Sequence, residues 1–128
     1  MVGDNFAGSV IVDWSIFHGV FDSAEIRRYA PMDPGVYLLW QQVKRDKWVL
    51  FYVGETRDLE QTLINHLSGD ETNSCVREKV QHHECGFEYA VISSKEIRKG
   101  IVKFLYDHYK PKCVPKDPGG RPIEVNLP

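Results

Sequence analysis

The sequence predicts an α/β fold in which a small, mostly antiparallel three-stranded sheet is flanked by helices, and three patterns support this. Residues 36–40 and 48–53 are rich in β-branched and aromatic side chains and are joined by a polar stretch, as in a β-hairpin. Leucine recurs every four residues from Leu59 to Leu67, which predicts a helix with one apolar face. Residues 95–110 show the same helical periodicity. Such helices bury their apolar faces against a sheet, so these elements belong to one core.

The elements before the hairpin are short. Residues 9–14 combine valine, isoleucine and tryptophan in the manner of a short strand. Asp22 or Ser23 then offers an N-cap for a helix over residues 24–30. Pro31 ends that helix, because proline lacks the N–H group that a helix interior requires.

The elements after the hairpin are separated by polar or glycine-containing loops. Asp58 is the expected N-cap of the leucine-rich helix. Residues 75–82 predict a second short helix, and residues 87–92 predict the third strand. The tail is rich in proline and glycine until residues 123–127, which are expected to add an edge strand.

The last helix is predicted to follow the N-cap Ser94 and to end before Pro111. At 100° per residue its side chains separate into two faces. The apolar face carries Ile97, Ile101, Phe104, Leu105 and His108. The opposite face carries Lys95, Lys99, Lys103, Tyr106 and Lys110. We expect this second set, the lysine stripe, to be exposed.

A chain of 128 residues fits one compact domain, which we interpret as residues 31–128 preceded by an N-terminal extension over residues 1–30. The longest apolar run, residues 48–53, is far shorter than the roughly 20 residues of a membrane-spanning helix, so no membrane contact is expected. Asp4 and the lack of a basic leading segment argue against a secretion signal. Three cysteines, an odd number without disulfide-framework spacing, predict reduced thiols in a cytoplasmic protein.

The net charge of −2 conceals an asymmetry along the chain. Residues 1–94 hold 8 Lys or Arg against 14 Asp or Glu, a net charge of −6, whereas residues 95–128 hold 8 against 4, a net charge of +4. The C-terminal quarter is therefore where a polyanion would bind. The same charges are also typical of a solvated helix and tail, so composition leaves both interpretations open.

Two tripeptides stand on the predicted hairpin: Gly-Val-Tyr at residues 35–37 and Tyr-Val-Gly at residues 52–54. Together with the helix, strand and helix that follow, they resemble the GIY-YIG endonuclease family. His66 and the Lys-Pro-Lys segment at residues 110–112 strengthen the resemblance, which covers about residues 31–114.

The resemblance implies that Tyr37 and Tyr52 share a pocket beside the sheet, with Tyr37 as general base. It also implies an arginine on the first helix after the hairpin that contacts the scissile phosphate, and a glutamate on the last helix that binds a divalent metal. These groups suit phosphodiester cleavage, because an arginine fork bonds two phosphate oxygens and Mg²⁺ prefers oxygen ligands.

The sequence departs from the family pattern at three polar positions. Thr62 stands at the arginine position, Val102 at the glutamate position, and Val114 where an asparagine often follows Lys-Pro-Lys. Loss of a single electrostatic contact of this kind typically costs a factor of about 10² to 10³ in rate. We therefore expect a catalytically degenerate domain that carries no cofactor.

One alternative retains enzymatic activity in a rearranged site. Arg57 at the strand-to-helix turn would supply the cation, and Glu55 the carboxylate of a Mg²⁺-dependent endonuclease. The catalytic candidates are then Tyr37, Tyr52 and Arg57. The expected pocket residues are Gly54, Glu55, Thr62 and His66.

A zinc site is a further alternative that the sequence does not favour. Cys75, His82, His83 and Cys85 are residue types that bind zinc, but no Cys-x₂-Cys pair accompanies them. No metal ligand is therefore predicted.

The predicted function is binding of DNA or RNA by a degenerate domain. The lysine stripe would contact phosphates, and Tyr106 within it could stack on bases. A solvated polar face is the alternative interpretation of the stripe. A protein-interaction module, in which Trp14, Phe17 and Phe21 face a protein partner, is the remaining alternative function.

Overall fold

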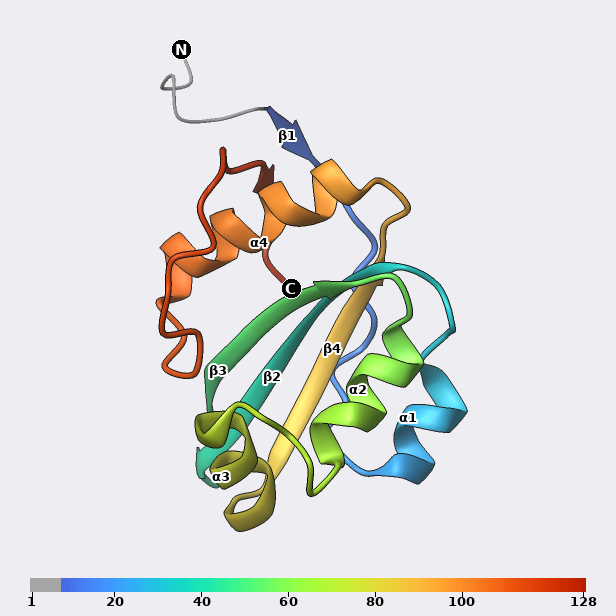
Figure 1. The fold of residues 1–128 in the computed structure, drawn as a ribbon, viewed down its shortest axis with the longest axis vertical. Helices are drawn as coiled ribbons and strands as arrows, with labels where there is room; N and C mark the ends of the chain where they lie inside the picture. Colours follow the sequence, from blue (N-terminus) through green and yellow to red (C-terminus); the bar gives the residue numbers. More distant parts are fainter. Residues whose placement is uncertain (1–7) are drawn as a thin grey trace.

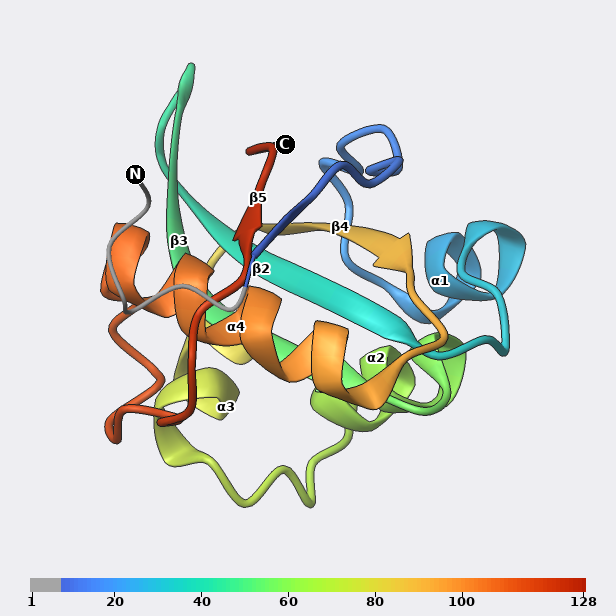
Figure 2. The same ribbon diagram turned by 90° about the horizontal axis from the view of Figure 1, so that it is seen from above.

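The computed structural model describes residues 8–128, which adopt the predicted α/β fold (Figures 1 and 2). Its central sheet has three antiparallel strands in the order β3-β2-β4. The strands are β2 (Gly35–Lys44), β3 (Lys47–Thr56) and β4 (Cys85–Val91). The two strands of the hairpin are longer than predicted, because the polar residues between them continue the ladder up to Lys44 and Lys47.

Four helices surround the sheet, each beginning where the sequence provides a capping side chain. They are α1 (Ser23–Tyr29), α2 (Leu59–Leu67), α3 (Ser74–His82) and α4 (Lys95–Tyr109). The caps are Asp22, Asp58, Asn73 and Ser94, whose side chains accept hydrogen bonds from first-turn N–H groups. Within residues 8–128, none of these helices has the length and apolar character needed to cross a membrane.

Alternation along β2 divides the core into two layers. Val36 and Leu38 face α4, whereas Tyr37 and Leu39 face α1, α2 and α3. Figure 1 shows the strands running between α4 on one side and α1 and α2 on the other. A strand buried on both faces requires apolar residues at consecutive positions, which explains the uninterrupted apolar run in β2.

The two terminal strands pair with each other instead of extending the main sheet. β1 (Ser9–Val10) and β5 (Glu124–Val125) form a parallel two-stranded sheet, so the predicted strands over residues 9–14 and 123–127 are too long. The Asn126 side chain ends the ladder, because it accepts a hydrogen bond from the Val12 N–H and donates one to the Val12 carbonyl.

Residues 8–30 lie against the sheet and complete both core layers. Ser15 and His18 pair with the backbone of β4 and cover its outer edge. Phe21 packs in the layer beneath α1 to α3, and Trp14 packs in the layer beneath α4. Trp14 and Phe21 are partly buried against the protein's own core, so the expectation that they face a protein partner is wrong for these two rings. Phe17, the third residue of that expectation, is 40% exposed.

α4 buries a face that differs slightly from the prediction. Ile101 and Leu105 are buried as expected, and Arg98 and Val102 are buried beside them. His108 is exposed and its ring meets that of Tyr109 edge-on, so its assignment to the packed face is wrong. It lies in the last turn of α4, away from the centre of the buried face.

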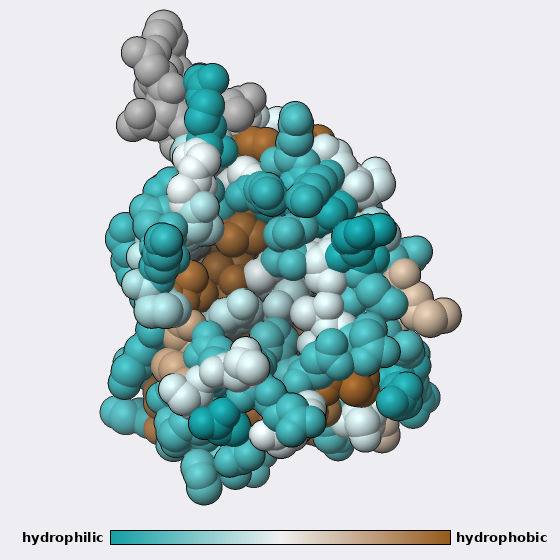
Figure 3. Space-filling view, viewed as in Figure 1, coloured by the Kyte–Doolittle hydropathy of each residue, from teal (hydrophilic) through white to brown (hydrophobic). Residues whose placement is uncertain are grey.

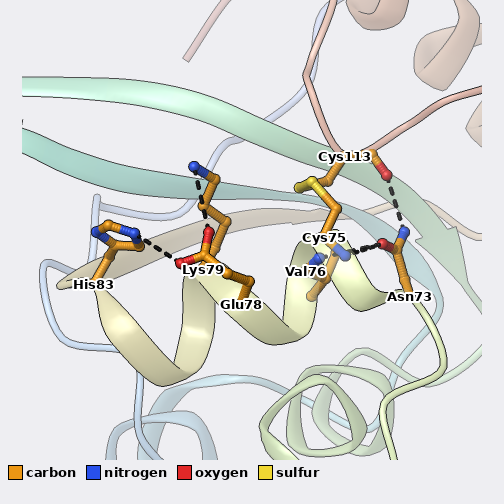
Figure 4. The surroundings of a disulfide bond; sticks show 7 residues. All are labelled: Asn73, Cys75, Val76, Glu78, Lys79, His83 and Cys113. Carbon is orange, nitrogen blue, oxygen red and sulfur yellow. Dashed lines mark hydrogen bonds and ion pairs between the residues drawn. A yellow bond between two sulfur atoms is a disulfide. The ribbon is translucent and has the colours of Figure 1, made fainter.

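The expectation of reduced cysteines is also wrong, because Cys75 and Cys113 form a disulfide (Figure 4). These residues are 38 positions apart in sequence, and folding brings their Cα atoms to 5.3 Å, within the usual range for such a bond. The spacing gave no sign of this pair, since the contact is tertiary. Cys85 is the free cysteine and is buried.

Candidate functional site

The rings of Tyr37 and Tyr52 lie close together above the β2–β3 hairpin. Tyr37 pairs with Gly54 across the ladder, and its ring lies over β3 with its centroid 6.0 Å from that of Tyr52. A Cβ atom at position 54 would lie 2.6 Å from the Tyr37 hydroxyl oxygen. Glycine is therefore required at this position so that the tyrosine can cross the neighbouring strand.

A chain of hydrogen bonds runs inward from a carboxylate to Tyr37. The Tyr37 hydroxyl is 2.8 Å from His66 Nε2, and His66 Nδ1 bonds the Glu71 carboxylate. A carboxylate only accepts, so Nδ1 carries the proton that faces Glu71. Nε2 of the neutral ring then accepts the hydroxyl proton of Tyr37. The arrangement orients the imidazole and keeps Tyr37 protonated.

Burial and the surrounding charges set the protonation states of this chain. Burial, followed by the neighbouring Tyr52 and the carboxylates of Glu71 and Glu55, raises the pKa of Tyr37 well above its ordinary value. Burial also raises the pKa of Tyr52, against a hydrogen bond with Tyr37 that lowers it. The pKa of His66 is lowered by burial, although Glu71 opposes the shift. At neutral pH these groups are therefore a neutral imidazole and two neutral phenols.

A polar hollow of about 470 Å³ opens beside this chain. Its lining includes Thr62, which hydrogen-bonds Thr56 at 2.6 Å, and the carboxylates of Asp70 and Glu71. Its lining residues are Tyr37, Thr62, Asn65, His66, Ser68, Asp70, Glu71 and Thr72. Within the described chain, this lining includes two carboxylates and neither lysine nor arginine. A phosphate placed here would meet negative charge without a compensating cation.

A second hollow of about 520 Å³ lies between α4, the end of β3 and the C-terminal segment. In the space-filling view a hydrophobic, recessed area lies over α4 among hydrophilic side chains (Figure 3). The lining includes Val102 and the cationic side chains of Lys99 and Arg121. Its lining residues are Glu55, Glu96, Lys99, Gly100, Val102, Pro118, Gly119, Gly120 and Arg121. This hollow carries the cations that the first one lacks.

Glu55 is bound by a buried arginine that the prediction did not include. Arg98 Nε donates to Glu55 Oε1 at 2.8 Å, and Arg98 Nη1 donates to the carbonyls of Ile92 and Ser93. Arg98 is only 3 % exposed, so its charge is compensated by these fixed contacts. Glu55 therefore stabilises an internal cation. Its carboxylate does not lie free for a metal.

The residues present do not fit the divalent metal that the family resemblance implies. Val102 offers no oxygen ligand, and the nearby Glu55 carboxylate is bound to Arg98. Among residues 8–128, no three His, Cys, Asp or Glu side chains are grouped closely enough to hold a metal ion. Cys75 is in the disulfide, and His83 bonds Glu78 at 3.0 Å, so the zinc alternative has no assembled ligands in this region.

The lysine stripe is only partly available to a ligand. Lys103 is mostly buried against its neighbours and forms ion pairs with Asp107 at 2.8 Å and Asp117 at 2.9 Å. Lys103 and Lys110 both lie over the ring of Tyr106. Lys95 and Lys99 are exposed. The expectation of five exposed side chains is therefore wrong for Lys103, because two carboxylates hold its ammonium group.

The structure separates the predicted site residues into two groups. Tyr37, Tyr52, Thr62 and His66 come together, whereas Arg57 is exposed at the turn before α2 and is absent from both lining sets. Glu71 was missed, since it lies in a polar loop that has no periodicity. Arg98 carried a detectable signal, because it precedes Ile101 by three positions on the apolar face of α4.

Comparison with known proteins finds similarity only among solved structures. No family model matches the chain, and no curated protein matches it. The GIY-YIG N-terminal endonuclease domain of UvrC from Thermotoga maritima, as a point mutant bound to its catalytic divalent cation, is 23% identical with a TM-score of 0.52. That match covers 72% of this chain and 97% of the other.

The magnesium-bound form of the same domain is 24% identical and covers 70% of this chain and 94% of the other, with a TM-score of 0.50. These similarities confirm that the chain has a GIY-YIG-like fold. At this level of identity they establish the fold alone.

Proposed function

We propose that this chain is a nucleic-acid-binding domain that does not cleave its ligand. The carrying observation is the second hollow, where Lys99 and Arg121 lie beside Val102 while Arg98 binds Glu55. The hollow also contains the carboxylates of Glu55 and Glu96, but Arg98 binds Glu55, and no group of three metal-ligand side chains is assembled among residues 8–128. Cations without an assembled metal site suit retention of a phosphodiester better than its hydrolysis. The structural similarity to an endonuclease domain supports the choice of ligand class.

In this proposal, the charges of the lining residues determine which of the two hollows binds the phosphate backbone. The first hollow contains the Asp70 and Glu71 carboxylates, which repel a phosphate. The second hollow contains Glu55 and Glu96 as well as Lys99 and Arg121, and the charge of Glu55 is compensated by Arg98. Lys95 and Lys110 add positive charge, because they are exposed on the same helix or at its end. The phosphate backbone of DNA or RNA therefore lies along α4 and residues 118–121, and the tyrosine site is left without a scissile bond.

Binding is tested by fluorescence anisotropy with labelled DNA and RNA over a series of salt concentrations. Lys99→Glu should weaken binding and lower the slope of log K against log salt by about one unit for each phosphate that the variant no longer neutralises. Lys44→Glu is the matched control, because it reverses one exposed charge at the hairpin tip, away from the start of α4 (Figure 1). Equal effects of the two variants, or no binding by the parent at low salt, would contradict the proposal.

Cleavage is tested separately with plasmid or labelled oligonucleotide in the presence of Mg²⁺ or Mn²⁺. We expect no nicking above background, because the arginine and glutamate positions hold Thr62 and Val102. Each missing electrostatic interaction costs a factor of about 10² to 10³ in rate. Nicking that disappears in Tyr37→Phe would instead establish the endonuclease alternative.

A further inference from the structure

The disulfide lies at the base of the loop that supplies the carboxylate of the tyrosine site. Cys75 is the second residue of α3, and Cys113 follows α4, so the bond joins two elements that are distant in sequence. Residues 68–73 connect α2 to α3 and include Glu71. Figure 4 shows Asn73 beside the disulfide, in contact with both sides of it.

Asn73 connects the disulfide to Glu71. Its side-chain oxygen accepts hydrogen bonds from the N–H groups of Cys75 and Val76, and its amide nitrogen donates to the Cys113 carbonyl at 2.9 Å. The Asn73 backbone N–H donates to Glu71 Oε2 at 3.0 Å. One residue therefore contacts both cysteines and the carboxylate.

Glu71 in turn connects this loop to the tyrosine site. Its other carboxylate oxygen bonds His66, whose Nε2 accepts from Tyr37. Arg77 Nη1 donates to the Glu71 carbonyl at 2.6 Å and fixes the loop from the α3 side. A continuous set of contacts therefore runs from the disulfide through Asn73, Glu71 and His66 to Tyr37.

The two sulfur atoms differ in their access to a reductant. Cys113 is fully buried, whereas Cys75 is partly exposed at the start of α3. Access therefore makes Cys75 the sulfur that an external thiolate attacks. The N-terminus of a helix stabilises a thiolate, and the first turn of α3 contains no acidic residue to oppose this. Cys75 is therefore also a good leaving group when a second thiol displaces it from the mixed disulfide.

We propose that the Cys75–Cys113 disulfide is a redox switch that controls the position of Glu71 and hence the order of the tyrosine site. A dithiol reductant attacks Cys75 Sγ as a thiolate, the S–S bond breaks, and Cys113 leaves as a thiolate that takes up a proton. The second reductant thiol then displaces Cys75 and forms the disulfide of the reductant. Two electrons and two protons are transferred to the protein, which gains two thiols.

Reduction removes the covalent tether between α3 and the segment after α4. The hydrogen bond from Asn73 to the Cys113 carbonyl is then no longer supported by the disulfide beside it. The loop of residues 68–73 opens locally. Glu71 withdraws from His66, and water enters the hollow. This proposal does not depend on the ligand that the domain binds.

The experiment uses the intact chain, air-oxidised and after treatment with dithiothreitol. Alkylation under denaturing conditions followed by mass spectrometry should detect one reactive cysteine before reduction, Cys85, and three after it. Amide hydrogen exchange at Asn73, Cys75 and Val76 should approach that of an open loop on reduction. Amides of β2 should lose only the protection that corresponds to the lower global stability, and should remain far better protected than the loop. The His66 imidazole signals should move toward those of a hydrated histidine.

Variants separate the switch from a purely structural role. Cys75→Ser/Cys113→Ser should show the reduced-state pattern with or without dithiothreitol, whereas Cys85→Ser should respond like the parent. Asn73→Ala should loosen Glu71 and shift the His66 signals while the disulfide remains closed, because Asn73 carries the contact between them.

Three outcomes would overturn the proposal. The first is unchanged exchange and imidazole signals after the bond has been reduced. The second is equal exchange of the β2 and loop amides after reduction, since this shows that the whole fold opens and not the loop alone. The third is three alkylatable cysteines that do not form the bond when oxidised glutathione is added.

Discussion

At the scale of single residues, the site depends on contacts that tolerate little change in volume or polarity. Tyr37 reaches across β3 only because position 54 lacks a side chain. Its hydroxyl then meets His66, whose second nitrogen is bound by Glu71. Tyr37 is 3 % exposed, so its hydroxyl group must find its hydrogen-bond partner inside the protein.

Gly54→Ala should destabilise the fold and disturb the tyrosine site. The added methyl group would lie 2.6 Å from the Tyr37 hydroxyl oxygen and 2.7 Å from its Cζ atom. Overpacking of this kind costs about 1–3 kcal/mol of unfolding free energy, measurable by urea denaturation. Gly69→Ala is the control, because nothing lies within 4 Å of its added methyl group. Equal stability of the two variants would contradict the steric role of Gly54.

His66 should make stability depend on pH. Burial lowers its pKa in the folded state below the ordinary value of 6.5, so the unfolded chain binds a proton more readily. The stabilisation is complete above about pH 6.5 and is lost as the pH falls through the folded pKa. Urea denaturation at several pH values between about 5 and 8, where histidine titrates, measures this change. His66→Gln should flatten the profile, and an unchanged profile would assign the effect to another group.

The residues of the site differ in how far sequence could predict them. Tyr37, Gly54 and His66 were predicted because they belong to local motifs near element boundaries. Glu71 was not, since its partner is chosen by the path of an irregular loop. The Cys75–Cys113 pair was not, since bringing these residues together requires the whole of β4 and α4.

At the scale of elements, the best-predicted features are the caps of α1, α2 and α4 and the periodicity of α2 and α4, whereas the Asn73 cap of α3 was not predicted. All four N-caps are side chains that sequence alone marks as strong caps, and α4 buries Ile101 and Leu105 as its periodicity requires. The tail was less predictable. It docks on α4 through Gly100, whose carbonyl accepts a hydrogen bond from the Ile123 N–H.

Gly100→Ala should displace the tail even though alanine favours a helix. The new methyl group would lie 2.4 Å from Ile123 Cγ1, so the segment around β5 must shift. Helix propensity offers a compensating gain of about 1 kcal/mol. Amide exchange at Ile123 and Val125 should therefore accelerate, and Ile123→Ala in the same chain should restore close docking. Unaltered exchange in Gly100→Ala would mean that the Ile123 side chain moves aside while the backbone of the tail stays in place.

At the scale of the whole molecule, residues 8–30 are packed as part of the core. Ile26 and Phe21 fill one layer, Trp14 packs in the other, and Ser15 and His18 cover the edge of β4. The sequence suggested a boundary at residue 31 because the family-like motifs begin there, and that boundary stays a prediction. Apolar residues before it contribute to the same layers as those after it.

A chain of residues 31–128 should therefore fold poorly on its own. Removal of the preceding segment exposes the edge of β4 and the apolar surface that Ile26 and Phe21 cover, which favours aggregation. Circular dichroism and size-exclusion chromatography against residues 8–128 provide the measurement. A cooperative unfolding transition of monomeric 31–128 would show that the earlier residues are dispensable.

The disulfide should contribute measurably to global stability. It closes a loop with a sequence separation of 38 residues, and loop-closure entropy predicts a contribution of about 4 kcal/mol. Cys113→Ser should lower the urea midpoint by a corresponding amount. Cys85→Ser is the control, because it replaces a buried cysteine that forms no disulfide. Similar midpoints for the parent and Cys113→Ser would show that the bond adds little stability.

The pairing of β1 with β5 also determines the order in which the chain can fold. Ser9 pairs with Glu124, so this contact spans almost the whole sequence, whereas the β2–β3 hairpin closes locally. Contacts between distant segments form slowly because the intervening chain must first lose conformational entropy. During synthesis β1 emerges early but has no partner until residues 124 and 125 have been added. The two-stranded sheet should therefore assemble last, after the hairpin and α4 have created the surface on which both strands lie.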